Sequence, residues 1–163
     1  MDKHNDTTKV SKKQRSSYLR YSGMIATSTC VMYGLTYLNT YALDHVYWSE
    51  MRVYMSIMMG SVMALIMLAF MLHMLKNTAI NVTIIAVSVV VFAGMLALVR
   101  SQITVQDVSW MKAMIPHHSI AILTSERAEI SDPRVRKLAD EIIEAQRREI
   151  DEMKALIADL KSK

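Results

Sequence analysis

The stretch WMKAMIPHHSIAI, residues 110–122, holds the side chains best suited to chemistry. Met111 and Met114 precede Pro116, and two adjacent histidines, His117 and His118, follow it. At about 100° per helical residue, Met111, Met114 and His118 fall within about 60° of one another. Thioether sulfur and imidazole nitrogen together select Cu(I) over Mg²⁺, Ca²⁺ or Mn²⁺. The spacing predicts either a copper site or, more plainly, methionines in a helix seam beside surface or capping histidines.

A further candidate ligand lies near the C-terminus. Met153 belongs to the apolar face of a second helix, and an antiparallel arrangement would bring its later turns toward Met111 and Met114. Proline removes a backbone donor, so Pro116 should kink the first helix and turn the histidines toward the sulfurs. Neutral ligands bind copper modestly, so the site should be labile. The predicted Cu(I) ligands are His117, His118, Met111, Met114 and Met153.

The rest of the chain predicts an all-α membrane protein. Of its 163 residues, 52% are hydrophobic and only 4 are Gly and 2 Pro, a composition that favours long helices. Three apolar runs, near residues 21–43, 54–74 and 80–99, are each about 20 residues long, enough to cross a bilayer. We therefore expect a basic tail at 1–20, three membrane spans within 21–100 and an external domain at 101–163.

Charge sets the expected orientation. Residues 1–20 carry six Lys or Arg against two Asp, which accounts for the whole formal charge of +4 and should keep this tail in the cytoplasm. Three spans then place residues 101–163 in the periplasm or outside the cell, on a bacterial inner membrane. The remainder is near neutral, so no nucleic-acid surface is expected. Cys30 is alone and forms no intrachain disulfide.

The external domain should be a helical hairpin. We expect the third span to continue as one helix through Pro116 to about Ala128, and a second helix to begin at Pro133 with Asp132 as its N-cap. A two-helix hairpin leaves half of its apolar seam uncovered, so a second copy should complete a four-helix bundle. The seam on the second helix comprises Val135, Leu138, Ile142, Ile150, Met153, Ile157 and Leu160.

The second span is rich in methionine, and the chain holds 15 in all. A row at every fourth residue winds by roughly 200° and rises about 30 Å, so it forms flexible packing or a ladder of weak sites, not one site. The outer end of this span is the better candidate for metal, since Met51, Met55 and Met58 share a face near acidic residues and His45. The row comprises Met51, Met55, Met59, Met63, Met67 and Met71.

The C-terminal third resembles the CopM-type family, helical domains of unknown function linked to copper binding. The resemblance is carried by MIPHHSIAI and by DPRVRKLADEIIEAQRREIDEMKALI. It implies a periplasmic or envelope helical protein in which the Met and His residues of the motif are copper ligands. Many relatives carry a methionine where this chain has Thr124, which removes one potential sulfur ligand.

The sequence therefore predicts a membrane-anchored copper-binding protein that buffers, sequesters or hands over Cu(I), as in copper resistance. Expected partners are the lipid bilayer, a second copy and other copper-handling proteins. The alternative is a structural module that drives oligomerisation in the membrane without metal. No Ser-His-Asp arrangement, phosphate-binding loop, zinc-type Cys cluster or Glu-x-x-His motif is evident, so no enzyme is predicted.

Overall fold

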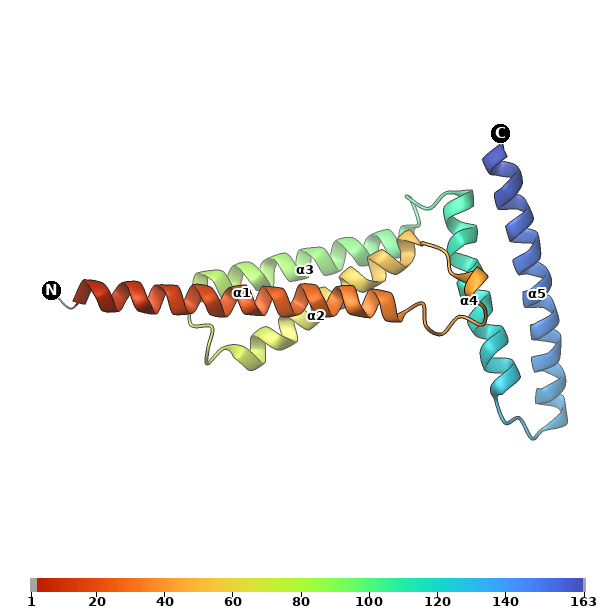
Figure 1. Cartoon of the computed structure of the whole chain (residues 1–163), viewed down its shortest axis with the longest axis horizontal. Coiled ribbons are helices and arrows are strands. Elements are labelled where there is room, and N and C mark those ends of the chain that lie inside the picture. The colour runs from red at the N-terminus through yellow and green to blue at the C-terminus, as the bar shows by residue number, and fades with distance from the viewer. Residues whose placement is uncertain (1–2, 163) are drawn as a thin grey trace. The chain divides into compact units, whose positions relative to one another are not determined.

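The computed structural model describes residues 3–162, and every regular element in that range is a helix, which confirms the expected all-α class. The chain divides into two compact units. The N-terminal unit comprises residues 3–33 and 54–101, and the C-terminal unit comprises residues 34–53 and 102–162. The elements are α1 (Lys3–Leu35), the short 3-10 helix η1 (Leu43–His45), α2 (Glu50–Met71), α3 (Thr78–Ser101), α4 (Asp107–Arg127) and α5 (Pro133–Ser162) (Figure 1).

Within residues 3–162, two helices are long and apolar enough to cross a membrane, α2 and α3. The first expected span, at residues 21–43, is not one of them, so the described residues offer two candidate spans and not three. Helix α1 ends at Leu35, where turns close as Tyr37 N–H donates to Gly34 O and Leu38 N–H donates to Leu35 O. Serine, threonine and tyrosine also dilute its apolar character. Two spans alone would return the chain to the side of the basic tail, so the expected periplasmic position of residues 101–163 is not supported.

Helix α1 packs closely on α2 inside the N-terminal unit. The hydroxyl of Tyr21, which is buried, donates to the Ala64 carbonyl at 2.6 Å. One turn earlier along α2, Gly60 faces Thr29, and a Cβ at Gly60 would collide with the Thr29 hydroxyl oxygen. A glycine is therefore required here by close approach of two helices, as is common between membrane helices.

Replacing Gly60 with alanine should destabilise the protein by roughly 1–3 kcal/mol, because the added methyl overpacks the contact with Thr29. The matched control is Gly94→Ala on α3, where nothing lies within 4 Å of an added Cβ. There alanine should be neutral or stabilising by up to about 1 kcal/mol, because it lowers the entropy cost of helix formation. Thermal unfolding in detergent measures both; equal effects would contradict the close α1–α2 contact.

The expected continuous helix from the third span into the C-terminal segment is wrong. Helix α3 ends at Ser101 and α4 begins at Asp107. Between them Gln102 adopts a positive φ of 55°, and Val105 N–H donates to the Gln102 carbonyl at 2.9 Å. No glycine or proline marks this turn; three consecutive β-branched residues at 103–105, poor helix formers, follow Gln102.

Helices α4 and α5 lie side by side and share one core (Figure 1). Helix α4 continues through Pro116, which is buried inside it. The predicted start of α5 is confirmed, since α5 begins at Pro133 and Arg134 N–H donates to the Asp132 carboxylate at 2.8 Å. The buried core of this pair comprises Met111, Ile115, Ile122, Ile150, Met153 and Ile157.

Candidate metal centre

A cavity of about 250 Å³ lies between α4 and α5. Three of the five predicted ligands line it: Met111 and His118 from α4, and Met153 from α5. Both methionines are buried, at 4% and 6% exposure, so packing in the core fixes the positions of their side chains. The rest of the lining is Trp110, Glu149, Glu152 and Leu156.

The other two predicted ligands lie apart from this cavity. Met114 is half-buried and packs against the same core, but it is not part of the lining. His117 is exposed, and its ring centroid lies 6.1 Å from that of His118 with the planes tilted by 60°. Successive helical residues diverge by about 100°, so two adjacent histidines cannot both face one seam.

His118 has an unusual environment. Its Nδ1 atom is shielded from solvent and has no hydrogen-bond partner, although the Glu149 Oε2 atom lies 3.4 Å away. The geometry of this contact does not meet that of a hydrogen bond, and it is an ion pair only when the imidazole is protonated. Burial lowers the pKa of His118 below its ordinary value; the charge of His117 adds to this, whereas Glu149 opposes it. The imidazole is therefore held neutral near pH 7, the form that binds metals.

The sequence alone did not identify Glu149 as part of the lining of this cavity. The carboxylate accepts a hydrogen bond of 3.4 Å from the Gln146 amide, one turn earlier on α5. Glu149 and Met153 are four residues apart, so the helical spacing from Met153 could have identified it. The described residues contain no group of three or more His, Cys, Asp or Glu side chains able to hold a metal. A metal here would therefore depend on thioether sulfur.

The segment before α2 attaches to α4 through Ser119, which is fully buried. Ser119 Oγ accepts a hydrogen bond from Tyr41 N–H at 2.7 Å and lies 3.0 Å from His45 Nδ1. Burial lowers the pKa of His45, and its neighbour Asp44 pairs with Lys154 of α5. Ser119 is no nucleophile, because substrate cannot reach it. The contacts of Tyr41 and His45 with Ser119, together with the Asp44–Lys154 ion pair, fix the segment before α2 on α4 and α5.

The N-terminal end of the methionine row is divided between the two units. Met51 belongs to the C-terminal unit, where its sulfur accepts a hydrogen bond from the Gln102 amide at 3.8 Å. Met55 and Met58 belong to the N-terminal unit. His45, expected beside them, has its Nδ1 against Ser119. The cavity between α4 and α5 is therefore the better candidate for a metal centre.

Comparison with known proteins supports a family assignment. The chain is 32% identical over 108 residues to Uncharacterized protein L153 of Acanthamoeba polyphaga mimivirus, an alignment that covers 64% of this chain and 68% of that protein. No solved structure matches the chain. The family described as Domain of unknown function (DUF305) matches residues 92–160, from the end of α3 through α4 and nearly all of α5. The chain therefore belongs to the DUF305 family.

Proposed function

We propose that the protein is a membrane-anchored copper-binding protein in which Met111, His118 and Met153 hold Cu(I). The observation that carries the proposal is the buried Nδ1 of His118, which has no hydrogen-bond partner and belongs to a residue lining a cavity with two methionines. A buried polar atom without a partner is costly, and a metal ion would satisfy it.

The donor set fits a soft monovalent ion. Two thioethers and one neutral imidazole match Cu(I), whereas zinc prefers thiolate, imidazole or carboxylate. Copper is the cargo of such a site, and neutral ligands keep it exchangeable, as buffering, sequestration or hand-over to another copper-handling protein requires. In this proposal Met114 and the exposed His117 lie beside the site and assist entry and exit of the ion.

The proposal also includes the location of the protein and its assembly with a second copy. Helices α2 and α3 would anchor the protein in a bacterial inner membrane. The copper-binding unit would face the periplasm, where methionine and histidine do not suffer the oxidation that disables thiols. With the basic tail in the cytoplasm, this orientation requires the apolar part of α1 to cross the membrane as well. A second copy would cover the exposed apolar side chains of α5 and complete a four-helix bundle. These side chains are Val135, Leu138, Ile142, Leu156 and Leu160.

The proposal predicts a defined pH dependence of Cu(I) binding. Because the pKa of His118 is lowered below its ordinary value of about 6.5, protons compete with copper at His118 only below that value. Affinity contributed by this imidazole should thus change little between pH 8 and pH 7 and fall under acidic conditions below its ordinary pKa.

Anaerobic titration of the purified full chain, in competition with a chromophoric Cu(I) chelator across this pH range, measures that profile. The proposal fails if the chain takes up no Cu(I). If the affinity for Cu(I) already falls between pH 8 and pH 7, His118, whose pKa is lowered, is not a ligand of the site.

A second candidate function is a structural module that associates in the membrane without metal. The observation that favours it is the burial of Met111 and Met153 within the α4–α5 core, where methionine packs well without binding anything. Under this alternative, oligomers of the full chain would resist a copper chelator, and the titration above would show no uptake.

A further inference from the structure

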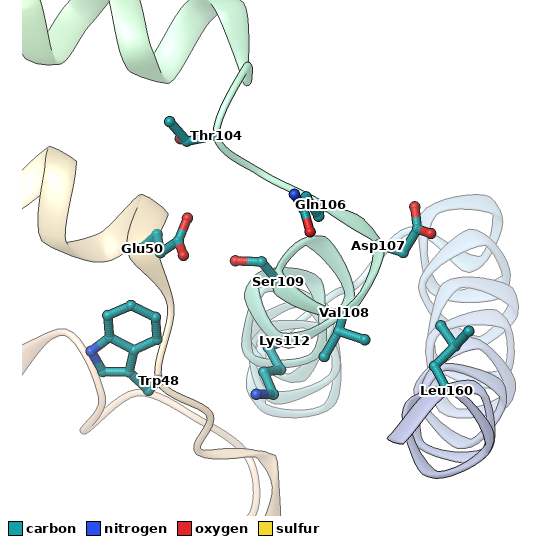
Figure 2. A pocket seen from close by; sticks show the side chains of 9 residues that line it. All are labelled: Trp48, Glu50, Thr104, Gln106, Asp107, Val108, Ser109, Lys112 and Leu160. Atoms are coloured by element: carbon teal, nitrogen blue, oxygen red, sulfur yellow. The ribbon is translucent and has the colours of Figure 1, made fainter. Parts of the chain in front are cut away.

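A second, larger cavity of about 560 Å³ occurs in the C-terminal unit, away from the three candidate copper ligands. Its walls come from the segment leading into α2, from the turn before α4 and from the first turns of α4 (Figure 2). Figure 2 shows the Glu50 carboxylate and the Ser109 hydroxyl pointing into the same space, with the Trp48 ring and Lys112 also along it.

Glu50 is incompletely satisfied in this position. Its Oε2 atom is shielded from solvent and has no hydrogen-bond partner. Glu50 is the first residue of α2, where negative charge is favoured by the helix dipole, but that effect supplies no donor to this oxygen. Since a buried acceptor without a donor costs free energy, the site calls for a ligand that donates hydrogen bonds.

Lys112 supplies the opposite charge. Among the described residues no ion pair joins the Lys112 ammonium to Glu50. The cavity is therefore lined by two carboxylates, Glu50 and Asp107, and by the Lys112 ammonium, and Ser109 offers a hydroxyl to either charge. Such a surface is complementary to a zwitterion that carries an ammonium and an anionic group.

The position along the chain identifies the kind of zwitterion. Glu50 is where the candidate span α2 begins, and Thr104, also in the lining, lies three residues past the end of α3. If α2 and α3 cross the bilayer, as proposed above, this cavity lies at the depth of the lipid headgroups. Trp48, at 60% exposure, is the residue type that concentrates at that depth.

We propose that this cavity binds the headgroup of an ethanolamine phospholipid. The primary ammonium pairs with the Glu50 carboxylate, and the phosphate lies against Lys112 and the Ser109 hydroxyl. A choline headgroup has no N–H to donate, and a glycerol headgroup can donate only a neutral hydroxyl hydrogen bond, so neither gives Glu50 a charge-assisted hydrogen bond. The inference rests on the membrane part of the proposed function and is independent of copper binding.

The test uses the full chain in detergent with Trp110→Phe, which leaves Trp48 as its one tryptophan. Short-chain phosphatidylethanolamine, phosphatidylcholine, phosphatidylglycerol and free phosphoethanolamine are each titrated while Trp48 emission is recorded. Phosphatidylethanolamine should bind about tenfold more tightly than the other three, and Glu50→Gln should abolish that preference, as expected for loss of a charge-assisted hydrogen bond.

Glu144→Gln, an exposed carboxylate on α5 outside the cavity, is the matched control and should bind like the parent. Lys112→Gln serves as the second variant should Glu50→Gln fail to fold, and it should weaken all phosphate-bearing probes. Equal binding of the three lipids, or an unchanged Glu50→Gln variant, overturns the proposal. Free phosphoethanolamine binding as tightly as the lipid would also overturn it, in favour of a small soluble zwitterion.

A separate measurement distinguishes this failure from failure of the membrane anchor. Extraction of native membranes with alkaline carbonate should leave the full chain in the membrane pellet. Release into the supernatant would refute the anchor itself. Retention in the pellet without a preference for ethanolamine lipid would refute only the lipid site.

Discussion

Replacement of His118 by alanine is expected to weaken Cu(I) binding by the full chain at least about tenfold, because loss of even an outer partner of a metal ligand costs roughly 10–100-fold. His118 lines the cavity between α4 and α5 and has a buried Nδ1 without a hydrogen-bond partner. The adjacent His117 is exposed and outside the lining, so His117→Ala should bind nearly as well as the parent. Competition titration against a Cu(I) chelator measures both.

This pair of variants is a stringent comparison because the two residues have the same chemistry and differ only in the direction of their side chains. Met111→Leu and Met153→Leu extend it, since leucine keeps the apolar volume and removes the sulfur. Each should lower the affinity for Cu(I) with little change in stability. Equal loss in His117→Ala and His118→Ala would mean that the histidines bind copper from the surface, and the cavity would then not be the site.

Replacement of Ile150 by alanine should have the largest effect on stability, a loss of about 3 kcal/mol. Ile150 is 1% exposed and lies in the core between α4 and α5 together with Ile115 and Met153. Truncation removes buried methyl groups and leaves a void that helices packed along their length can only partly close. Denaturation by urea, followed by tryptophan fluorescence of the full chain in detergent, gives the free energy of unfolding.

The control is Leu138→Ala on the same helix, at 56% exposure, which should cost well under half as much. If Leu138→Ala proves as costly as Ile150→Ala, the exposed face of α5 is buried in solution. That outcome would support a second copy covering α5 and would require the core of the single chain to be reassessed.

Local sequence signals predicted the parts of the structure that local interactions determine. The Asp-Pro step at 132–133 fixes the start of α5, because the Asp132 side chain caps it and the ring of Pro133 suits the first helical position. The spacing of Met111 and His118, together with the apolar period that includes Met153, was enough to bring three candidate ligands to one cavity.

Features that depend on tertiary contacts could not be predicted from local sequence signals. The turn at Gln102 contains no glycine or proline, so nothing local distinguishes it from a continuous helix. The attachment of Tyr41 and His45 to Ser119 joins residues more than 70 positions apart, and no periodicity within either segment encodes it. The distinct roles of His117 and His118 likewise follow only from where α5 lies against α4.

Thioether sulfur and imidazole nitrogen are together proposed to hold Cu(I) between α4 and α5. X-ray absorption at the copper edge of the Cu(I)-loaded full chain tests this proposal most directly, because it distinguishes sulfur from nitrogen and oxygen neighbours. We expect a mixed coordination shell of sulfur and nitrogen, and loss of the sulfur contribution in Met111→Leu/Met153→Leu. A shell of nitrogen and oxygen alone, or sulfur that persists in the double variant, would contradict it.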